Sequence, residues 1–151
     1  MFQHYHHTQF GTVLVALIGL GFLGAMAASL AVHQFTLAAM FLLILLITLA
    51  LSGWMTIEVG EGVLRWRMGI GLMGGSCALA EIAEVSLVRN PWWYGLGVHL
   101  TPDGWLYNVS GSQAVRIQLT SGRAVRLGTD EPQMLLDALD PDTQRRDRAG
   151  R

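Results

Sequence analysis

The sequence predicts a membrane-spanning α-helical hairpin followed by a small, mainly β domain. Residues 10–54 contain no Asp, Glu, Lys or Arg, whereas all 10 basic and all 11 acidic residues lie from Glu58 onward. Beyond Thr56, apolar and polar residues alternate and turn signals recur about every eight to twelve residues, which is typical of short antiparallel strands. A hydrophobic content of 52% and a mean hydropathy of +0.40 are high for a soluble chain of 151 residues.

Two apolar runs, about 10–32 and 35–55, are expected to be the membrane helices. Each holds about 20 residues, which at about 1.5 Å per residue crosses a hydrocarbon layer about 30 Å thick. Trp54 stands where an interfacial aromatic residue is expected. A secretory signal ending near Ser29-Leu30-Ala31 is the alternative for the first run, but no Lys or Arg precedes that run. We therefore favour the hairpin.

Small residues in the first run predict close helix packing. Gly21, Gly24, Ala25 and Ala28 form steps of four residues on neighbouring faces. Small side chains let helix backbones approach closely in lipid. We expect them to pack most simply against the second helix, with another copy or a partner protein as alternatives.

The arginines that follow the second run set the expected orientation. Arg65 and Arg67 come soon after it, whereas the short linker around His33 and Gln34 has no Lys or Arg. By the positive-inside tendency, both termini are expected on the cytoplasmic side.

Residues 1–9 are expected to be a polar N-terminal tail. They contain His4, His6 and His7, which could bind a metal, but a flexible tail lacks the fixed geometry that a metal site needs. We favour an interfacial tail with Tyr5 at the headgroup level.

Residues 56–140 are expected to form the β domain, and residues 141–151 a polar, disordered tail. A helix is predicted to begin near Pro132, because Thr129, Asp130 and Glu131 suit a helix N-terminus. The seven predicted strands are 56–59, 63–68, 84–89, 97–101, 105–109, 114–119 and 124–127.

Three segments of this domain resemble bacterial pleckstrin-homology-like (PH-like) membrane proteins. They are 83–89, the aromatic-glycine segment 93–105, and Leu127-Gly-Thr-Asp-Glu-Pro132. The resemblance implies a seven-stranded PH-like barrel or sandwich capped by a C-terminal helix, in a two-helix protein of the bacterial inner membrane. This family is largely uncharacterised, so the resemblance implies fold and topology but no chemistry.

Phosphoinositide-binding proteins of the same fold hold phosphates with a basic hairpin ending in Arg-x-Arg. Arg65-Trp66-Arg67 matches that ending, but Glu58 and Glu61 stand where lysines would be needed. The alternative is that the two arginines face solvent and Trp66 faces the core, as strand periodicity predicts.

Residues 69–74 match the dinucleotide pattern G-x-G-x-x-G. No acidic residue follows about twenty positions later, and no room remains for further βαβ units, so we reject a nucleotide site. A mobile glycine-rich connection explains the segment better, and its Ile70, Leu72 and Met73 could touch the bilayer. No catalytic set and no cofactor motif emerge, and the net charge of −1 gives no case for nucleic acid.

Pro91-Trp92-Trp93-Tyr94 is the most informative cluster of the β domain. Consecutive residues of an extended segment point alternately, so at most one or two of these rings can enter the core. The others are expected at a membrane interface or a protein contact, and Arg89 could hold a lipid phosphate or a neighbouring acid. Packing into the core is the alternative.

These observations lead to two functional hypotheses. The first is a non-catalytic, membrane-anchored interaction module, namely a scaffold, an assembly factor or an accessory subunit of a membrane protein complex. Its partners would be the lipid bilayer and either a membrane protein or another copy of the chain. The alternative is a lipid-binding or lipid-sensing protein.

Overall fold

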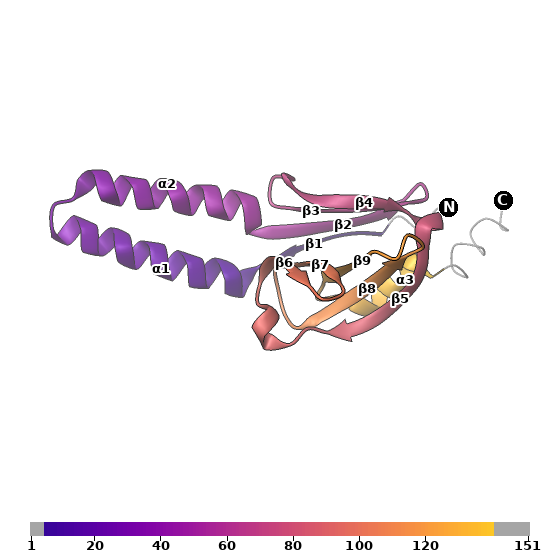
Figure 1. Cartoon of the computed structure of the whole chain (residues 1–151). Coiled ribbons are helices and arrows are strands. Elements are labelled where there is room, and N and C mark those ends of the chain that lie inside the picture. The colour runs from indigo at the N-terminus through magenta and orange to yellow at the C-terminus, as the bar shows by residue number, and fades with distance from the viewer. Residues whose placement is uncertain (1–4, 141–151) are drawn as a thin grey trace.

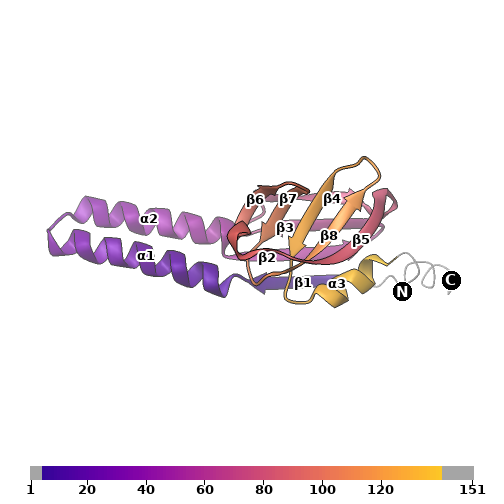
Figure 2. The ribbon, with the colours of Figure 1, turned by 60° about the horizontal axis from the view of Figure 1, so that its bottom comes forward.

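The computed structural model describes residues 5–140 of the chain. Two long helices lie side by side and project from one end of a β domain (Figures 1 and 2). In chain order the elements are β1 (Tyr5–Phe10), α1 (Thr12–Ala31), α2 (Phe35–Ser52), β2 (Trp54–Gly60), β3 (Val63–Met68), β4 (Met73–Ala78), η1 (Leu79–Glu81), β5 (Ile82–Arg89), η2 (Trp92–Tyr94), β6 (Gly97–Thr101), β7 (Gly104–Asn108), β8 (Gln113–Leu119), β9 (Ala124–Gly128) and α3 (Pro132–Leu139). The seven predicted strands and the C-terminal helix are present, but the described residues contain two further strands, β1 and β4, so the prediction of a seven-stranded domain is wrong.

The prediction that residues 1–9 form a tail is wrong for the described part of that segment. Residues 5–10 form β1, which pairs antiparallel with β2 from Tyr5↔Val59 to Phe10↔Trp54. The helical hairpin is therefore the connection between two paired strands. The β domain accordingly includes residues 5–10 and begins again at Trp54, so α2 ends three residues earlier than expected. The predicted disordered tail, 141–151, lies outside the described residues.

The strands form two sheets that do not close into a barrel. Sheet A has the order β1-β2-β3-β4, and sheet B has the order β5-β8-β9-β7-β6. All neighbours are antiparallel except β7 and β9, which run parallel from Trp105↔Val125 to Tyr107↔Leu127. The predictions of a closed barrel and of a purely antiparallel domain are therefore both wrong. Sheet B is mixed because β8 and β9 insert between β5 and β7.

The core lies between the two sheets. Period-two alternation directs one face of each strand inward, as in β3, where Leu64, Trp66 and Met68 are buried and Arg65 and Arg67 are exposed. Helix α3 packs against β5 and β8. Buried side chains come from both sheets and α3: Met55, Ile57, Val59, Leu64, Trp66, Met68, Val115, Ile117, Val125, Leu127, Leu135 and Leu139.

The side chain of Gln9, which is 2% exposed, connects strand β1 of sheet A to sheet B and the segments beside it. Its amide nitrogen donates to the Gly128 carbonyl. Its Oε1 accepts from the Ser110 hydroxyl at 3.1 Å and from the Asp130 N–H at 3.0 Å. Figure 2 shows α3 beside β1 on this side of the domain. Tyr5 is partly buried at the end of β1 farthest from the helices, so the expectation that it lies at the headgroup level is wrong. Burial raises the pKa of Tyr5 to about 12.

Helices α1 and α2 pack along a narrow stripe. Five partly or fully buried positions on each helix are spaced alternately three and four residues apart, as in a left-handed antiparallel helix pair. Phe22 and Phe41 meet edge to face with ring centroids 6.2 Å apart. The stripes are Val15, Ile18, Phe22, Ala25 and Ser29 on α1, and Ala38, Phe41, Leu45, Thr48 and Ser52 on α2.

Replacing Gln9 with Ala tests the anchoring of β1. The substitution leaves the Gly128 carbonyl and the Asp130 N–H without partners, so we expect a loss of about 1–3 kcal/mol in the free energy of unfolding. Denaturant unfolding of the full chain in mild detergent measures it. The matched control is Gln133→Ala on the exposed face of α3, where only an i, i+4 bond to Asp137 is lost and the expected change is below about 0.5 kcal/mol. Equal effects of the two substitutions would show that Gln9 does not anchor β1.

Candidate membrane-proximal interaction surface

The turn between β3 and β4 lies against the last turn of α2. The Ile70 N–H donates to the Ala50 carbonyl at 2.9 Å, and the Gly69 N–H donates to the Trp54 carbonyl at 2.8 Å. Gly69 has a φ of 50°, and a Cβ there would lie 2.1 Å from the Ala50 carbonyl oxygen, so the close approach requires glycine. Ile70 and Leu72 are 63% and 77% exposed beside this junction.

The loops after β5 and β7 lie at the same end of the domain, beside the start of α1. A Cβ on Gly11 would lie 2.8 Å from the Val109 carbonyl oxygen, which places the β7–β8 loop against the helix. The Asn108 amide donates to the Gly95 carbonyl at 3.3 Å and so ties the η2 segment to the same loop. Residues near positions 11, 95 and 109 therefore lie together. They are far apart in the sequence, so sequence analysis could not group them.

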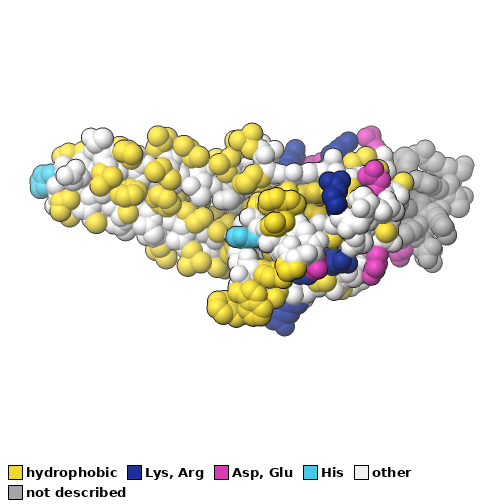
Figure 3. Space-filling view, in the orientation of Figure 1, with side chains coloured by type: hydrophobic (Ala, Val, Ile, Leu, Met, Phe, Trp, Pro, Cys, Tyr) yellow, Lys and Arg dark blue, Asp and Glu magenta, His cyan; other side chains and the backbone are white. Residues whose placement is uncertain are grey.

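Trp92 and Trp93 stand out from this end of the domain. They are 86% and 67% exposed, so the alternative that they pack in the core is wrong. They form a 3₁₀ turn, and their rings meet edge to face at 6.0 Å. Figure 3 shows hydrophobic side chains over the helices and a separate hydrophobic protrusion beside the helix bases. We call Trp92 and Trp93 the rim pair.

Tyr94 turns back toward the domain. The Arg126 guanidinium lies 5.6 Å from the centre of its ring, a cation–π contact. Arg126 also donates to Asp103 and, at 3.3 Å, to the Asn90 side chain. The hydrogen bond from Arg126 holds the pKa of Asp103 below its ordinary value. Tyr94 therefore fastens the turn that presents the rim pair.

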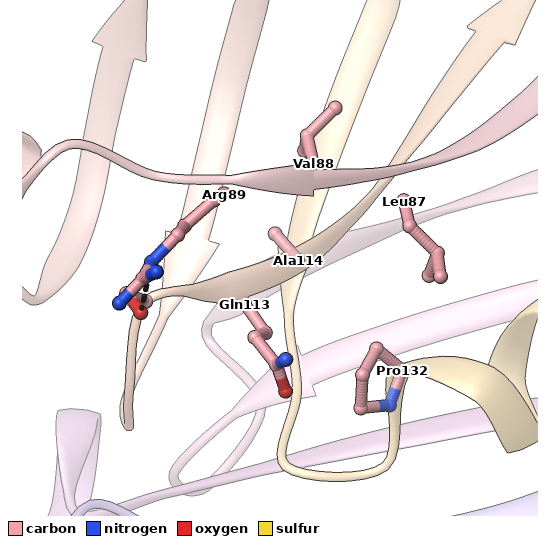
Figure 4. Close-up of a pocket in the computed structure, with 7 residues that line it drawn as sticks. Leu87, Val88, Arg89, Gln113, Ala114 and Pro132 are labelled. Carbon is pink, nitrogen blue, oxygen red and sulfur yellow. Dashed lines mark hydrogen bonds between the residues drawn. The ribbon is translucent and has the colours of Figure 1, made fainter.

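Arg89 borders a shallow groove of about 390 Å³ next to the rim pair. Figure 4 shows Arg89, Gln113 and Leu87 on one side of the β5–β8 pair, the side on which Pro132 begins α3, and Val88 pointing the other way. The Arg89 Nε donates to the Ser112 hydroxyl at 3.3 Å. Among the described residues no acidic group forms an ion pair with Arg89, so its charge is available to a ligand.

Arg65 and Arg67 do not form a phosphate site with this surface. Both are exposed on the outer face of β3, and Arg67 donates to Glu58 at 3.1 Å. Arg65 borders a hollow that also contains Glu58 and Glu61. The prediction that the two arginines face outward while Trp66 faces the core is confirmed by their burial. The neighbouring carboxylates disfavour phosphate binding by these arginines.

Three of the four small residues predicted to pack between the helices face outward instead. A Cβ on Gly21 or Gly24 would meet no atom within 4 Å, and Ala28 is exposed. Only Ala25 lies on the stripe that contacts α2. The larger side chains Phe22 and Phe41 set the rotation of α1, which turns the glycines away.

The N-terminal histidines bind side chains of the domain. The His7 ring nitrogens lie 2.7 Å from Asp130 Oδ1 and 3.3 Å from Glu131 Oε2, and His6 lies 3.3 Å from Glu58. No group of three or more metal-ligating side chains occurs within residues 5–140. His4 lies outside the described residues.

Comparison with known proteins gives no assignment. No protein-family description matches the chain, and neither curated proteins nor solved structures give a significant match.

A pair of identical substitutions tests the rotation of α1. Ala25→Leu adds three carbon atoms to the packed stripe, whereas Ala28→Leu adds them on the outward face. We expect Ala25→Leu to cost about 1–3 kcal/mol and Ala28→Leu to cost almost nothing, because overpacking strains an interface and not an open surface. Unfolding of the full chain in detergent micelles measures both. The reverse ranking would mean that Gly21, Gly24 and Ala28 form the contact with α2.

Proposed function

We propose that this chain is a non-catalytic, membrane-anchored interaction module, an accessory subunit or assembly factor of a membrane protein complex. The observation that carries the proposal is the rim pair. Two neighbouring tryptophans are held in a fastened turn, both largely exposed, at the end of the domain from which the helices project.

Membrane anchoring is supported by the surface of the hairpin. Both α1 and α2 are long and apolar enough to cross a membrane, with mean hydropathies of 2.3 and 2.6. Only 6% and 11% of their most apolar windows are buried, whereas the core helix of a soluble protein is mostly buried. Cleavage near Ala31 would also remove β1 and its Gln9 anchor, which argues against a secretory signal.

The orientation that we propose places the β domain and both chain ends in the cytoplasm of a bacterium, at the inner membrane. Arg67 and Arg89 lie on the domain side of the helices, and the His33–Gln34 linker has no Lys or Arg. A PH-like relationship is part of the same proposal. It is supported by two packed sheets followed by one C-terminal helix, although the sheets are open and one strand pair is parallel.

The rim pair suits a protein partner. Tryptophans are enriched among the residues that contribute most to binding, and their rings bury a large apolar area. The fixed attachment of the domain through β1 and β2 keeps this pair at one height beside the membrane. A partner subunit in the same bilayer would therefore meet a preorganised contact, which lowers the entropy lost on binding.

Lipid binding is the second candidate, and Arg89 is the observation that favours it. Its charge has no acidic partner among residues 5–140, and it lines a groove of mixed polar and apolar side chains next to the rim pair. Arginine beside interfacial tryptophans can hold a lipid phosphate while the rings rest at the headgroup level.

Replacing the rim pair with alanine separates these two candidates. If a protein partner buries the rings, Trp92→Ala and Trp93→Ala should each weaken association by about 2 kcal/mol or more. Native mass spectrometry of the complex from mild detergent, followed by titration of the identified partner, measures the loss. Met134→Ala, an exposed apolar residue on α3, is the control and should leave association unchanged.

Other outcomes would contradict the preferred function. Undiminished association of both variants would exclude the rim pair as the docking contact. If association is unaffected and the tryptophan fluorescence of the wild-type chain responds to anionic lipid in vesicles, the lipid-binding alternative replaces it. Loss of the near-ultraviolet circular dichroism of the whole domain would show that the rings are structural.

A further inference from the structure

The β sandwich is open on the side opposite β1 and α3. A cleft of about 690 Å³ separates the outer strand of sheet A, β4, from the β6–β7 hairpin and the β8–β9 turn of sheet B. Trp66 and Tyr107, from the inner faces of the two sheets, meet edge to face at 5.8 Å and line this cleft. Leu100 and Trp105 line it from β6 and β7 and are 71% and 52% exposed.

Strand β4 presents unpaired backbone groups along this cleft. The Leu79 N–H donates to the Gly62 carbonyl at 2.8 Å, which fixes the alternation of the antiparallel ladder. Gly75 and Cys77 therefore direct their N–H and C=O groups toward β3, whereas those of Gly74 and Ser76 point away from it. The same alternation explains why the next outward N–H, that of Ala78, binds the Glu81 carboxylate at 3.3 Å.

The outer edge of β4 lacks the features that normally prevent strand addition. Natural edge strands carry charges, prolines or bulges, or are very short. β4 has six residues and none of them is charged or proline. By contrast, β5 has charged residues and a bulge between Ile82 and Glu84, and β6 is five residues long and begins with Gly97 at a φ of 109°. The other edge of sheet A is β1, and its side chains are already bonded to residues 128–131.

We propose that β4 binds an extended segment of a partner protein, which adds to sheet A as a fifth strand and covers the cleft. Main-chain bonds to Gly74 and Ser76 would hold the segment, as in other complexes formed by strand addition. This inference rests on the proposed function, because it names a second contact of the same interaction module.

A second copy of this chain does not fit the β4 edge. The strands of sheet A run along the helix axes, as Figure 1 shows, so β4 lies along the membrane normal. Antiparallel pairing of two β4 strands needs a twofold axis across the strands, which would point the two helical hairpins in opposite directions. A twofold axis along the membrane normal keeps both copies in one membrane. It also places each outward N–H of one β4 strand opposite the same N–H of the other copy, so no hydrogen bonds can form between them.

The cleft also indicates the side chains of the segment. Apolar side chains would cover Trp66 and the exposed rings of the cleft, and small residues at 74–76 leave room for them. The Trp66 indole N–H is buried and has no acceptor among the described residues, so a bound acceptor would satisfy it. Arg123 lines the cleft and has no acidic partner in the described part of the chain, which favours an acidic residue at that end of the segment.

The test uses the full chain in nanodiscs and a synthetic eight-residue peptide of alternating Val and Thr with one terminal Glu. We expect peptide binding to slow hydrogen exchange at the amides of Gly74 and Ser76. Nuclear magnetic resonance measures the exchange rate of each amide. Gly75 and Cys77 should be protected with and without peptide, since they pair with β3. A peptide methylated at alternate backbone nitrogens, which cannot form the ladder, should not bind.

Two substitutions at one position provide the matched variants. Ser76→Pro removes only an outward N–H, so β3–β4 pairing is retained, and peptide affinity should fall about tenfold or more. Ser76→Ala keeps that N–H and should bind as the wild type does. Arg123→Ala should weaken the peptide that ends in Glu but not one that ends in Gln.

The results separate this inference from the rim contact. Equal binding to Ser76→Pro and Ser76→Ala, binding of the methylated peptide, or no protection at Gly74 and Ser76 would each overturn strand addition. Protection of these amides by anionic vesicles and not by the peptide would likewise replace it with a lipid site. Trp92→Ala should leave peptide binding unchanged. The strand-addition proposal and the rim-pair proposal can therefore fail independently of each other.

Discussion

Antiparallel pairing of β1 with β2 is the constraint on which the rest of the structure depends. These strands enter and leave the helical hairpin as direct neighbours, with Phe10 opposite Trp54 at its base. A domain joined to a hairpin by one flexible linker could tilt and move away from the bilayer. Two paired strands prevent this, because bending them apart would break ladder hydrogen bonds and remove Gln9 from its buried partners. The domain therefore keeps one orientation relative to the helices.

This fixed orientation gives each surface of the domain a defined position. The β3–β4 turn is bonded to α2, and the β7–β8 loop touches the start of α1, so the rim pair lies beside the helix bases. The cleft along β4 lies on the flank of the domain and runs parallel to the helix axes. A membrane protein with an extension on the same side of the membrane as the β domain could thus contact the rim with its membrane part and β4 with an extended segment. Two modest contacts on one rigid body can give a stable complex, because the second contact forms at a high effective concentration.

The sequence predicted those features that depend on local pattern. Charge-free runs located both helices, and alternation located seven strands. Strand β1 was missed because Tyr5–Phe10 is largely polar and its partner lies beyond two helices. Strand β4 was missed because the glycine-rich segment 69–74 suggested a loop, although β4 begins at Met73 and the Trp66 ring lies over Gly75 in place of a side chain. The exposure of rings in this cluster was predicted, but from alternation along an extended segment, whereas Trp92 and Trp93 lie on a 3₁₀ turn that exposes both. The rotation of α1 did not follow from its small residues, because the packed face depends on the fit of Phe22 against Phe41. The cleft assembles residues from strands of both sheets, a grouping that only the tertiary structure provides.

Hydrogen exchange along β1 in the full-length chain, reconstituted in a lipid bilayer, tests the central claim most directly. If β1 and β2 are paired across the hairpin, the ladder amides within residues 5–10 should exchange as slowly as their partners within 54–59, since both open only when sheet A unfolds. Rapid exchange throughout residues 5–10, with protection retained in β2 and β3, would contradict this account. It would show that the N-terminal segment is a tail and that the β domain is joined to the membrane through Trp54 alone.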